Sequence, residues 1–224
     1  MCGRYSLATP FDDLIEVFDV PPVDFEYRPR YNIAPTQVVP VVASDRHGKR
    51  MGLLRWGLVP SWAKGIGVGS RMINARSETL LEKPAFKSAV HSRRCLVPAD
   101  GFYEWRAGAG GKVPHLIRRT DGGPMAFAGL WERWDGGEGD PLFTFTIVTT
   151  DASPAIAQIH DRMPVILEGA ARASWMDRDM PGEEAVEFLS PYEGDLAAYE
   201  VSRLVNSPAN DVPECQNPVQ GVSG

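Results

Sequence analysis

The chain has 224 residues, 43% of them hydrophobic and 23% charged, which suits one globular domain or two closely packed halves. No stretch approaches the roughly 18 consecutive apolar residues of a membrane-spanning helix, and the N-terminus lacks the apolar core of a signal peptide. We therefore expect a cytoplasmic protein without a membrane anchor.

The first predicted element is a short helix that begins at Thr9-Pro10, with Thr9 as its N-cap and Leu14, Ile15 and Phe18 on its buried side. After a proline-rich stretch, strands are predicted over 38–43 and 50–56 around a turn, and then over 95–97, 101–106, 113–118, 125–130, 142–149 and 196–205. Further helices are predicted over 77–81, 84–91, 152–159, 170–176 and 183–189. Short strands with inserted helices and no regular βαβ alternation indicate a mainly antiparallel α+β fold. We expect one domain over 1–206 and an extension over 207–224 whose last residues are disordered.

The net charge of -6 is unevenly distributed along the chain. Between Arg28 and Arg94 there are 13 Lys and Arg against three acidic residues, whereas residues 101–224 hold 9 Lys and Arg against 19 Asp and Glu. This asymmetry fits a basic face that attracts phosphates, and equally fits basic side chains scattered over the surface.

Three cysteines, Cys2, Cys95 and Cys215, cannot all pair and lack the spacing of metal ligands, so we expect reduced thiols and neither a metal nor another cofactor. Cys95 and Cys215 are interpreted as inert structural thiols. Cys2 differs, because removal of Met1 by a methionine aminopeptidase would leave a free amine beside the thiol. At reference pKa values of about 7.7–8.0 and about 8.5, both groups have a reactive fraction near neutral pH. Such a 1,2-aminothiol condenses with an aldehyde to a thiazolidine, although Cys2 could equally be an idle residue of a terminal strand.

Asn74 and Arg76 are candidate ligands of a substrate oxygen and a phosphate, and the alternative is that Asn74 caps a helix. Glu104 lies among aromatic residues in Gly101-Phe102-Tyr103-Glu104-Trp105, where desolvation would raise its pKa towards neutrality, as a general acid or base requires. The alternative is a glutamate at a sheet edge that faces water.

His160, in Ile159-His160-Asp161-Arg162, is the side chain best suited to proton transfer near pH 7, and Arg162 could contact a phosphate. The alternative is a histidine that stabilises a helix C-terminus. Pro35 and Trp62 lie in loops of the basic segment and could stack on bases or wedge between them.

Together these motifs, in this order, closely resemble the SRAP family, the SOS-response-associated peptidases that cross-link to abasic sites. The resemblance spans nearly the whole chain. The residues that carry it are Met1-Cys2-Gly3-Arg4, Arg30-Tyr31-Asn32-Ile33-Ala34-Pro35, Trp56-Gly57 through Trp62, Ile73-Asn74-Ala75-Arg76, Gly101-Phe102-Tyr103-Glu104-Trp105, Ile159-His160-Asp161-Arg162 with Pro164, and Val201-Ser202.

The resemblance implies the SRAP fold, a single domain with a barrel-like β core and short helices. It also implies recognition of abasic sites in single-stranded DNA, including at junctions with duplex, as part of DNA repair in the SOS response, with the protein bound to the nucleoid when on DNA. The implied catalytic residues are Cys2 as nucleophile, Asn74 to position the opened sugar, Glu104 to manage protons and His160 to help open the deoxyribose. The implied DNA contacts are Arg4, Pro35, Trp62, Arg76, Thr149 and Arg162. A monomer is expected.

Two other functions fit parts of the sequence. Glutaminase domains of N-terminal-nucleophile amidotransferases also begin Met-Cys-Gly, but the sequence lacks the patterns of their oxyanion-hole and glutamine-binding loops. A non-catalytic single-stranded DNA-binding protein would share the basic segment but would not need Cys2.

Overall fold

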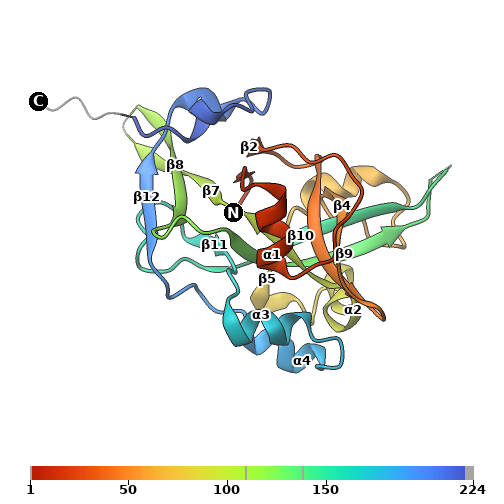
Figure 1. Ribbon diagram of the computed structural model, residues 1–224. Helices are drawn as coiled ribbons and strands as arrows, with labels where there is room; N and C mark the ends of the chain where they lie inside the picture. Colours follow the sequence, from red (N-terminus) through yellow and green to blue (C-terminus); the bar gives the residue numbers. More distant parts are fainter. Residues whose placement is uncertain (1, 109, 138, 220–224) are drawn as a thin grey trace, which may run out of the picture.

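A computed structural model describes residues 2–108, 110–137 and 139–219 and contains two β-sheets that meet at the N-terminal strand (Figure 1). The smaller sheet has five strands, each antiparallel to its neighbours. In spatial order these are β12 (Leu196–Glu200), β8 (Gly111–Arg119), β7 (Gly101–Gly108), β1 (Tyr5–Leu7) and β2 (Arg30–Ile33).

The larger sheet contains a five-stranded barrel, which closes because β9 pairs with β10 as well as with β6. Around the barrel the order is β10 (Leu142–Asp151), β4 (Gly48–Trp56), β3 (Val38–Asp45), β6 (Arg94–Ala99) and β9 (Met125–Trp134). All pairs are antiparallel except β10 with β4. The far end of β10 leaves the barrel and runs between two short strands, β5 (Asn74–Arg76) and β11 (Arg162–Pro164).

Short helices cover the strands, and α2, α3 and α4 gather at the lower side of the molecule in Figure 1. The α-helices are α1 (Phe11–Phe18), α2 (Pro84–Ser92), α3 (Gly169–Met176) and α4 (Gly182–Ala185), and the 3-10 helices are η1 (Ile66–Arg71), η2 (Ser77–Thr79), η3 (Val186–Phe188), η4 (Arg203–Asn206) and η5 (Pro213–Gln216). Within the described residues, no helix is long and apolar enough to cross a membrane.

Aromatic side chains fill the barrel and join it to β1. Tyr5 packs edge-on against Trp56 (ring centroids 5.2 Å apart) and Phe127 (6.2 Å), and Trp56 stacks on Phe145 (6.3 Å). All four are fully buried, and large aromatic rings contribute much of the apolar area that stabilises a core. Cys2, which precedes β1, therefore lies at the junction between the barrel and the five-stranded sheet.

The antiparallel α+β fold with a barrel core is confirmed, as are the hairpin of β3 and β4 and the positions of strands β6 to β10. The N-cap prediction is wrong: Pro10 occupies the N-cap of α1 without a side-chain bond, because the Thr9 hydroxyl binds Asp100 (2.5 Å). The strand predicted over 196–205 ends at Glu200, because the Ser202 hydroxyl caps the 3-10 turn η4.

The helix predicted over 152–159 is also wrong. The Ala152 N–H donates to the Asp161 carbonyl (2.9 Å), so the two ends of this segment lie together. A continuous helix of that length would hold its ends about 12 Å apart. The chain instead makes successive turns. The helix predicted over 77–81 is the single 3-10 turn η2, and the predictions omitted β1, β2, β5 and β11.

The segment that follows residue 206 contacts β2 through Asp211 and η5, and it ends beside β12, where Pro218 pairs with Val201 and the Val219 N–H donates to the Glu200 carbonyl (2.9 Å). The Asp211 carboxylate accepts the N–H groups of Tyr31 (2.6 Å) and Asn32 (3.0 Å) and binds the Arg30 guanidinium. Cys215 is fully buried beside Tyr103 in a small second core. The disorder predicted for the last residues concerns positions that lie outside the described residues.

Candidate active site

Cys2 is fully buried just before β1, and its thiol sulfur lies 3.9 Å from the Arg4 carbonyl oxygen. Burial raises the pKa of the Cys2 thiol well above its usual range, and the nearby Glu104 carboxylate raises it further. The reference pKa used in the sequence prediction thus overstates the thiolate fraction. A reaction at this sulfur needs a base beside it, and the side-chain charge that acts on the thiol is that of Glu104.

Glu104 lies on β7 opposite His115 of β8, and strand alternation turns it to the same face as Phe102, which packs in the main core. Its side chain is 4% exposed. Burial raises the pKa of Glu104 to about 7, and the Asp161 charge adds to the rise. The predicted desolvation of this carboxyl is confirmed, and a group with a pKa near 7 can both accept and release a proton at neutral pH.

His160 ends the loop between β10 and β11, and its Nε2 lies 3.8 Å from Glu104 Oε2. The backbone N–H of Arg162 donates to His160 Nδ1 (3.0 Å), so the neutral ring carries its proton on Nε2, towards Glu104. Partial burial lowers the pKa of His160, against the opposing effect of Asp161 at 2.9 Å from Nδ1. The neutral ring is therefore favoured at pH 7, and the helix-terminus alternative does not apply, since turns precede the residue.

The second half of β10 brings together three further candidate residues, Asn74, Arg76 and Thr149, where it pairs with β5 and β11. Asn74 pairs with Ile147, and Thr149 pairs with both Arg76 of β5 and Pro164 of β11. The buried Asn74 Oδ1 and Thr149 Oγ1 find no hydrogen-bond partner among the described residues. A buried polar atom without a partner is costly, so both are free to receive a donor from a ligand. Asn74 is part of a strand, which excludes the helix-cap alternative.

Arg162 lies in this region but is already engaged by two carboxylates. Its guanidinium donates to both oxygens of Glu78 (2.6 and 2.9 Å), to Asp151 Oδ1 (2.7 Å) and to the Thr149 carbonyl (2.8 Å). A phosphate could bind the terminal nitrogens of Arg162 only by displacing one of these acceptors, and Nε is buried without a partner among the described residues. The exposed Arg76 is next to this cluster.

Arg4 occupies a similar internal position. Its Nη1 donates to Asn32 Oδ1 (2.8 Å) and to the Val205 carbonyl (2.6 Å), and its guanidinium lies 5.8 Å from the centre of the Trp105 ring. These contacts join the N-terminus to β2 and to η4.

Pro35 and Trp62 lie in the two segments that adjoin the end of β4. Pro35 is the second residue of a turn whose third, Thr36, has φ 74°, a backbone conformation that normally requires glycine. Trp62 is 65% exposed, more than any other large hydrophobic residue in the described chain. An exposed indole in a rigid loop suits stacking on a planar group.

An open pocket of about 440 Å³ lies over the catalytic candidates and adds residues that sequence reasoning missed. Its walls are Glu104, His160, Trp105, Lys112 and Asn206. The Trp105 indole N–H donates to Asn206 Oδ1 (2.8 Å), and the Lys112 charge acts on His160. Lys112 lies in the β7–β8 hairpin opposite Ala107, and only the pairing of these strands identifies it as a pocket residue.

Several basic residues between Arg28 and Arg94 are already paired within the protein. At least five of the thirteen are engaged internally: Arg30, Lys49, Arg50 and Arg93 pair with carboxylates, and Arg94 donates to main-chain carbonyls.

The sequence and the fold are similar to those of known proteins. The profile of the family described as SOS response associated peptidase (SRAP) matches residues 1–208, and the chain belongs to this family. It is 46% identical over 219 residues to the abasic site processing protein YoqW of Bacillus subtilis, covering 96% of this chain and 98% of that one. It is also 37% identical to the abasic site processing protein HMCES of Gallus gallus, covering 87% and 67% of the two chains. A crystal structure of a protein from Bacteroides thetaiotaomicron matches with a TM-score of 0.87 and 26% identity over 97% of this chain and all of that one.

Proposed function

We propose that this protein captures abasic sites in single-stranded DNA as a covalent cross-link through Cys2. The relatives named above are abasic site processing proteins, which supports abasic DNA as the class of substrate. The observation that carries the chemistry is that the Cys2 thiol lies close enough to Glu104 for this carboxyl to affect its pKa. Glu104 itself has a pKa of about 7, and His160 Nε2 lies 3.8 Å from its Oε2.

The reaction requires removal of Met1, which converts Cys2 into a 1,2-aminothiol. The deoxyribose of an abasic site opens to an aldehyde, and His160 donates a proton towards the ring oxygen. The Cys2 amine adds to the aldehyde carbon and the adduct loses water to give an imine. The thiol then adds to the imine carbon, its proton passes through Glu104 to the nitrogen, and a thiazolidine ring results.

The remaining residues hold the DNA. Asn74 Oδ1 accepts a hydrogen bond from the Cys2 amine or the opened sugar, and Thr149, Arg76 and Arg162 contact the phosphates next to it. Trp62 and Pro35 support the flanking bases. Unstacking an abasic nucleotide costs less free energy than unstacking a normal one, so binding at the lesion is favoured over binding to an intact strand.

A denaturing gel tests this function. The protein lacking Met1 is incubated with a single strand that contains one abasic site, and a slower covalent band is expected. Cys2→Ala should abolish the band, and so should borohydride reduction of the site, which removes the aldehyde. Cys95→Ala is the matched control, since Cys95 is an equally buried thiol of the barrel and should leave the band unchanged. A band that survives Cys2→Ala would refute the proposal, and DNA binding without any band would indicate a non-catalytic DNA-binding protein.

A further inference from the structure

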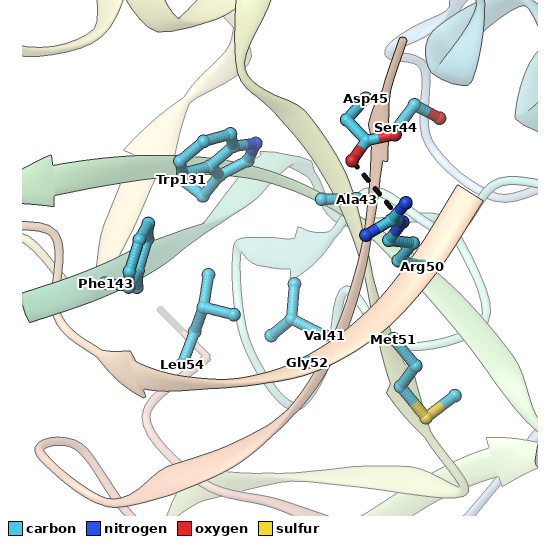
Figure 2. Close-up of a pocket in the computed structure, with 10 residues that line it drawn as sticks. All are labelled: Val41, Ala43, Ser44, Asp45, Arg50, Met51, Gly52, Leu54, Trp131 and Phe143. Carbon is cyan, nitrogen blue, oxygen red and sulfur yellow. Dashed lines mark ion pairs between the residues drawn. The ribbon is translucent and has the colours of Figure 1, made fainter. Parts of the chain in front are cut away.

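A second pocket, of about 310 Å³, opens at one end of the β-barrel (Figure 2). Most of its lining on β3 and β4 comes from Val41, Ala43 and Asp45 and from Arg50, Gly52 and Leu54, with Ser44 and Met51 as the other residues of these strands. The first six are alternate residues, and the register pairs Val41 with Gly52 and Ala43 with Arg50, so all six belong to one face of the sheet. Trp56, in the packed interior, continues that face, which makes the pocket the mouth of the barrel.

Two aromatic side chains form the opposite wall of this barrel mouth. Trp131 of β9 and Phe143 of β10 have ring centroids 6.1 Å apart at an interplanar angle of 43°. Phe143 is 42% exposed, whereas Val41 is fully buried and Leu54 is 9% exposed, so the pocket has an aliphatic floor and an accessible aromatic side. Barrel mouths with mainly apolar walls and a few polar groups are common sites for small molecules.

Gly52 leaves the pocket open. A Cβ atom built at this position would meet nothing closer than 3.8 Å, and its backbone is not in the left-handed region. A larger side chain at position 52 would therefore enter the mouth without straining the main chain. This glycine gives a direct way to fill the pocket.

Polar groups meet at one edge of the barrel mouth. The indole nitrogen of Trp131 is buried and has no hydrogen-bond partner among the described residues. In Figure 2 the nitrogen edge of this ring is turned to the side of Asp45 and Arg50, whose carboxylate and guanidinium are paired at 3.4 Å. An N–H donor, a carboxylate acceptor and a guanidinium donor thus adjoin an aromatic wall. Because Asp45 already balances the charge of Arg50, a neutral ligand fits better than an anion.

We propose that the barrel mouth binds an uncharged planar heteroaromatic group of nucleobase size. Its ring packs between the aromatic wall of Trp131 and Phe143 and the aliphatic floor. Its edge accepts hydrogen bonds from Trp131 Nε1 and Arg50 and donates one to Asp45. The packed rings of Tyr5, Trp56 and Phe145 fill the barrel interior, so this site is separate from the pocket lined by Glu104 and His160 and does not depend on the function proposed for Cys2.

Guanosine is a suitable probe, because its base carries a carbonyl acceptor beside two N–H donors. In a nitrogen-15 NMR titration we expect a saturable shift of the Trp131 indole N–H signal, identified by its loss in Trp131→Phe. Gly52→Val should weaken guanosine binding at least about tenfold, whereas Leu53→Val, on the outward side of the same strand, should leave it unchanged. Asp45→Asn should weaken guanosine binding but not the binding of 1-methylindole, which has no N–H to donate to the carboxylate.

The source of the base can be tested with an intact deoxyguanosine pentanucleotide in the same titration. Competition with guanosine would indicate a base presented on a strand, and a shift with guanosine alone would indicate a free nucleoside. The proposal is overturned if guanosine gives no saturable shift up to millimolar concentration, if Gly52→Val binds as wild type does, or if only 1-methylindole binds. None of these outcomes bears on the covalent chemistry of Cys2.

Discussion

The buried carboxyl of Glu104 links the stability of the fold to pH. Its pKa is raised from the ordinary 4.5 to about 7, so the folded protein holds this proton more tightly than the unfolded chain does. The contribution of Glu104 to stability is therefore greatest below about pH 4.5 and falls as the pH rises to about 7, by roughly 3 kcal/mol in all.

Glu104→Gln removes this dependence. At pH 8 the variant should have a free energy of unfolding up to about 3 kcal/mol above wild type, and the gain should shrink to near zero at pH 4.5. Urea unfolding at the two pH values measures it, with the exposed Glu214→Gln as a control that should change neither value. An equal gain at both pH values would show that the carboxyl is not titrating in this range.

Arg162 is held by Glu78 and Asp151, and this contact competes with any phosphate. If Arg162 contacts DNA as we propose, Glu78→Gln should strengthen binding to single-stranded DNA several-fold and make the salt dependence steeper by about one phosphate contact. Fluorescence anisotropy at two salt concentrations measures both effects. Glu82→Gln, an exposed glutamate in the following loop, controls for the loss of one negative charge. Equal effects of the two substitutions would mean that Arg162 has a structural role only.

At the scale of elements, the connection from β4 to η1 depends on two glycines in contact. Gly57 has φ 115°, and a Cβ atom there would come within 2.5 Å of the Gly69 carbonyl oxygen. Gly57→Ala should therefore destabilise the fold by about 1–3 kcal/mol, through backbone strain and this clash. Thermal unfolding measures the loss. Gly67→Ala, in η1 but facing open space, should be close to neutral, and an equal loss there would point to the flexibility of the loop instead.

The elements also show which parts of the structure could be predicted from sequence. Hairpins such as β3–β4 were predictable because their alternation and turn are local. The three-residue strands β1, β5 and β11 were not, because each exists only through pairing with a distant strand: β5 with Ile147 to Thr149, for example. The catalytic candidates were identified from motifs, whereas Lys112 and the partners of Arg162 come together only through long-range pairing.

At the scale of the whole molecule, the C-terminal segment fastens the first strands of the fold. Asp211 satisfies two backbone N–H groups of β2 and the Arg30 side chain. Asp211→Ala would leave these donors without an acceptor and should cost about 2–3 kcal/mol. Urea unfolding measures the cost, and Glu214→Ala, exposed three residues later, should cost little. A small effect of Asp211→Ala would mean that the segment is peripheral to stability.

The three cysteines have a consequence for how the molecule opens. All are fully buried, one in the barrel wall (Cys95), one at the junction of the sheets (Cys2) and one in the small second core (Cys215). A thiol reagent can reach each of them only when its own region unfolds transiently. The rate at which each cysteine is labelled in dilute denaturant therefore measures how often its own region opens. The order in which the three cysteines are labelled would show whether the junction of the sheets, which holds Cys2, opens before the barrel does. For the proposed reaction, it would show how an aldehyde on a DNA strand reaches a buried thiol.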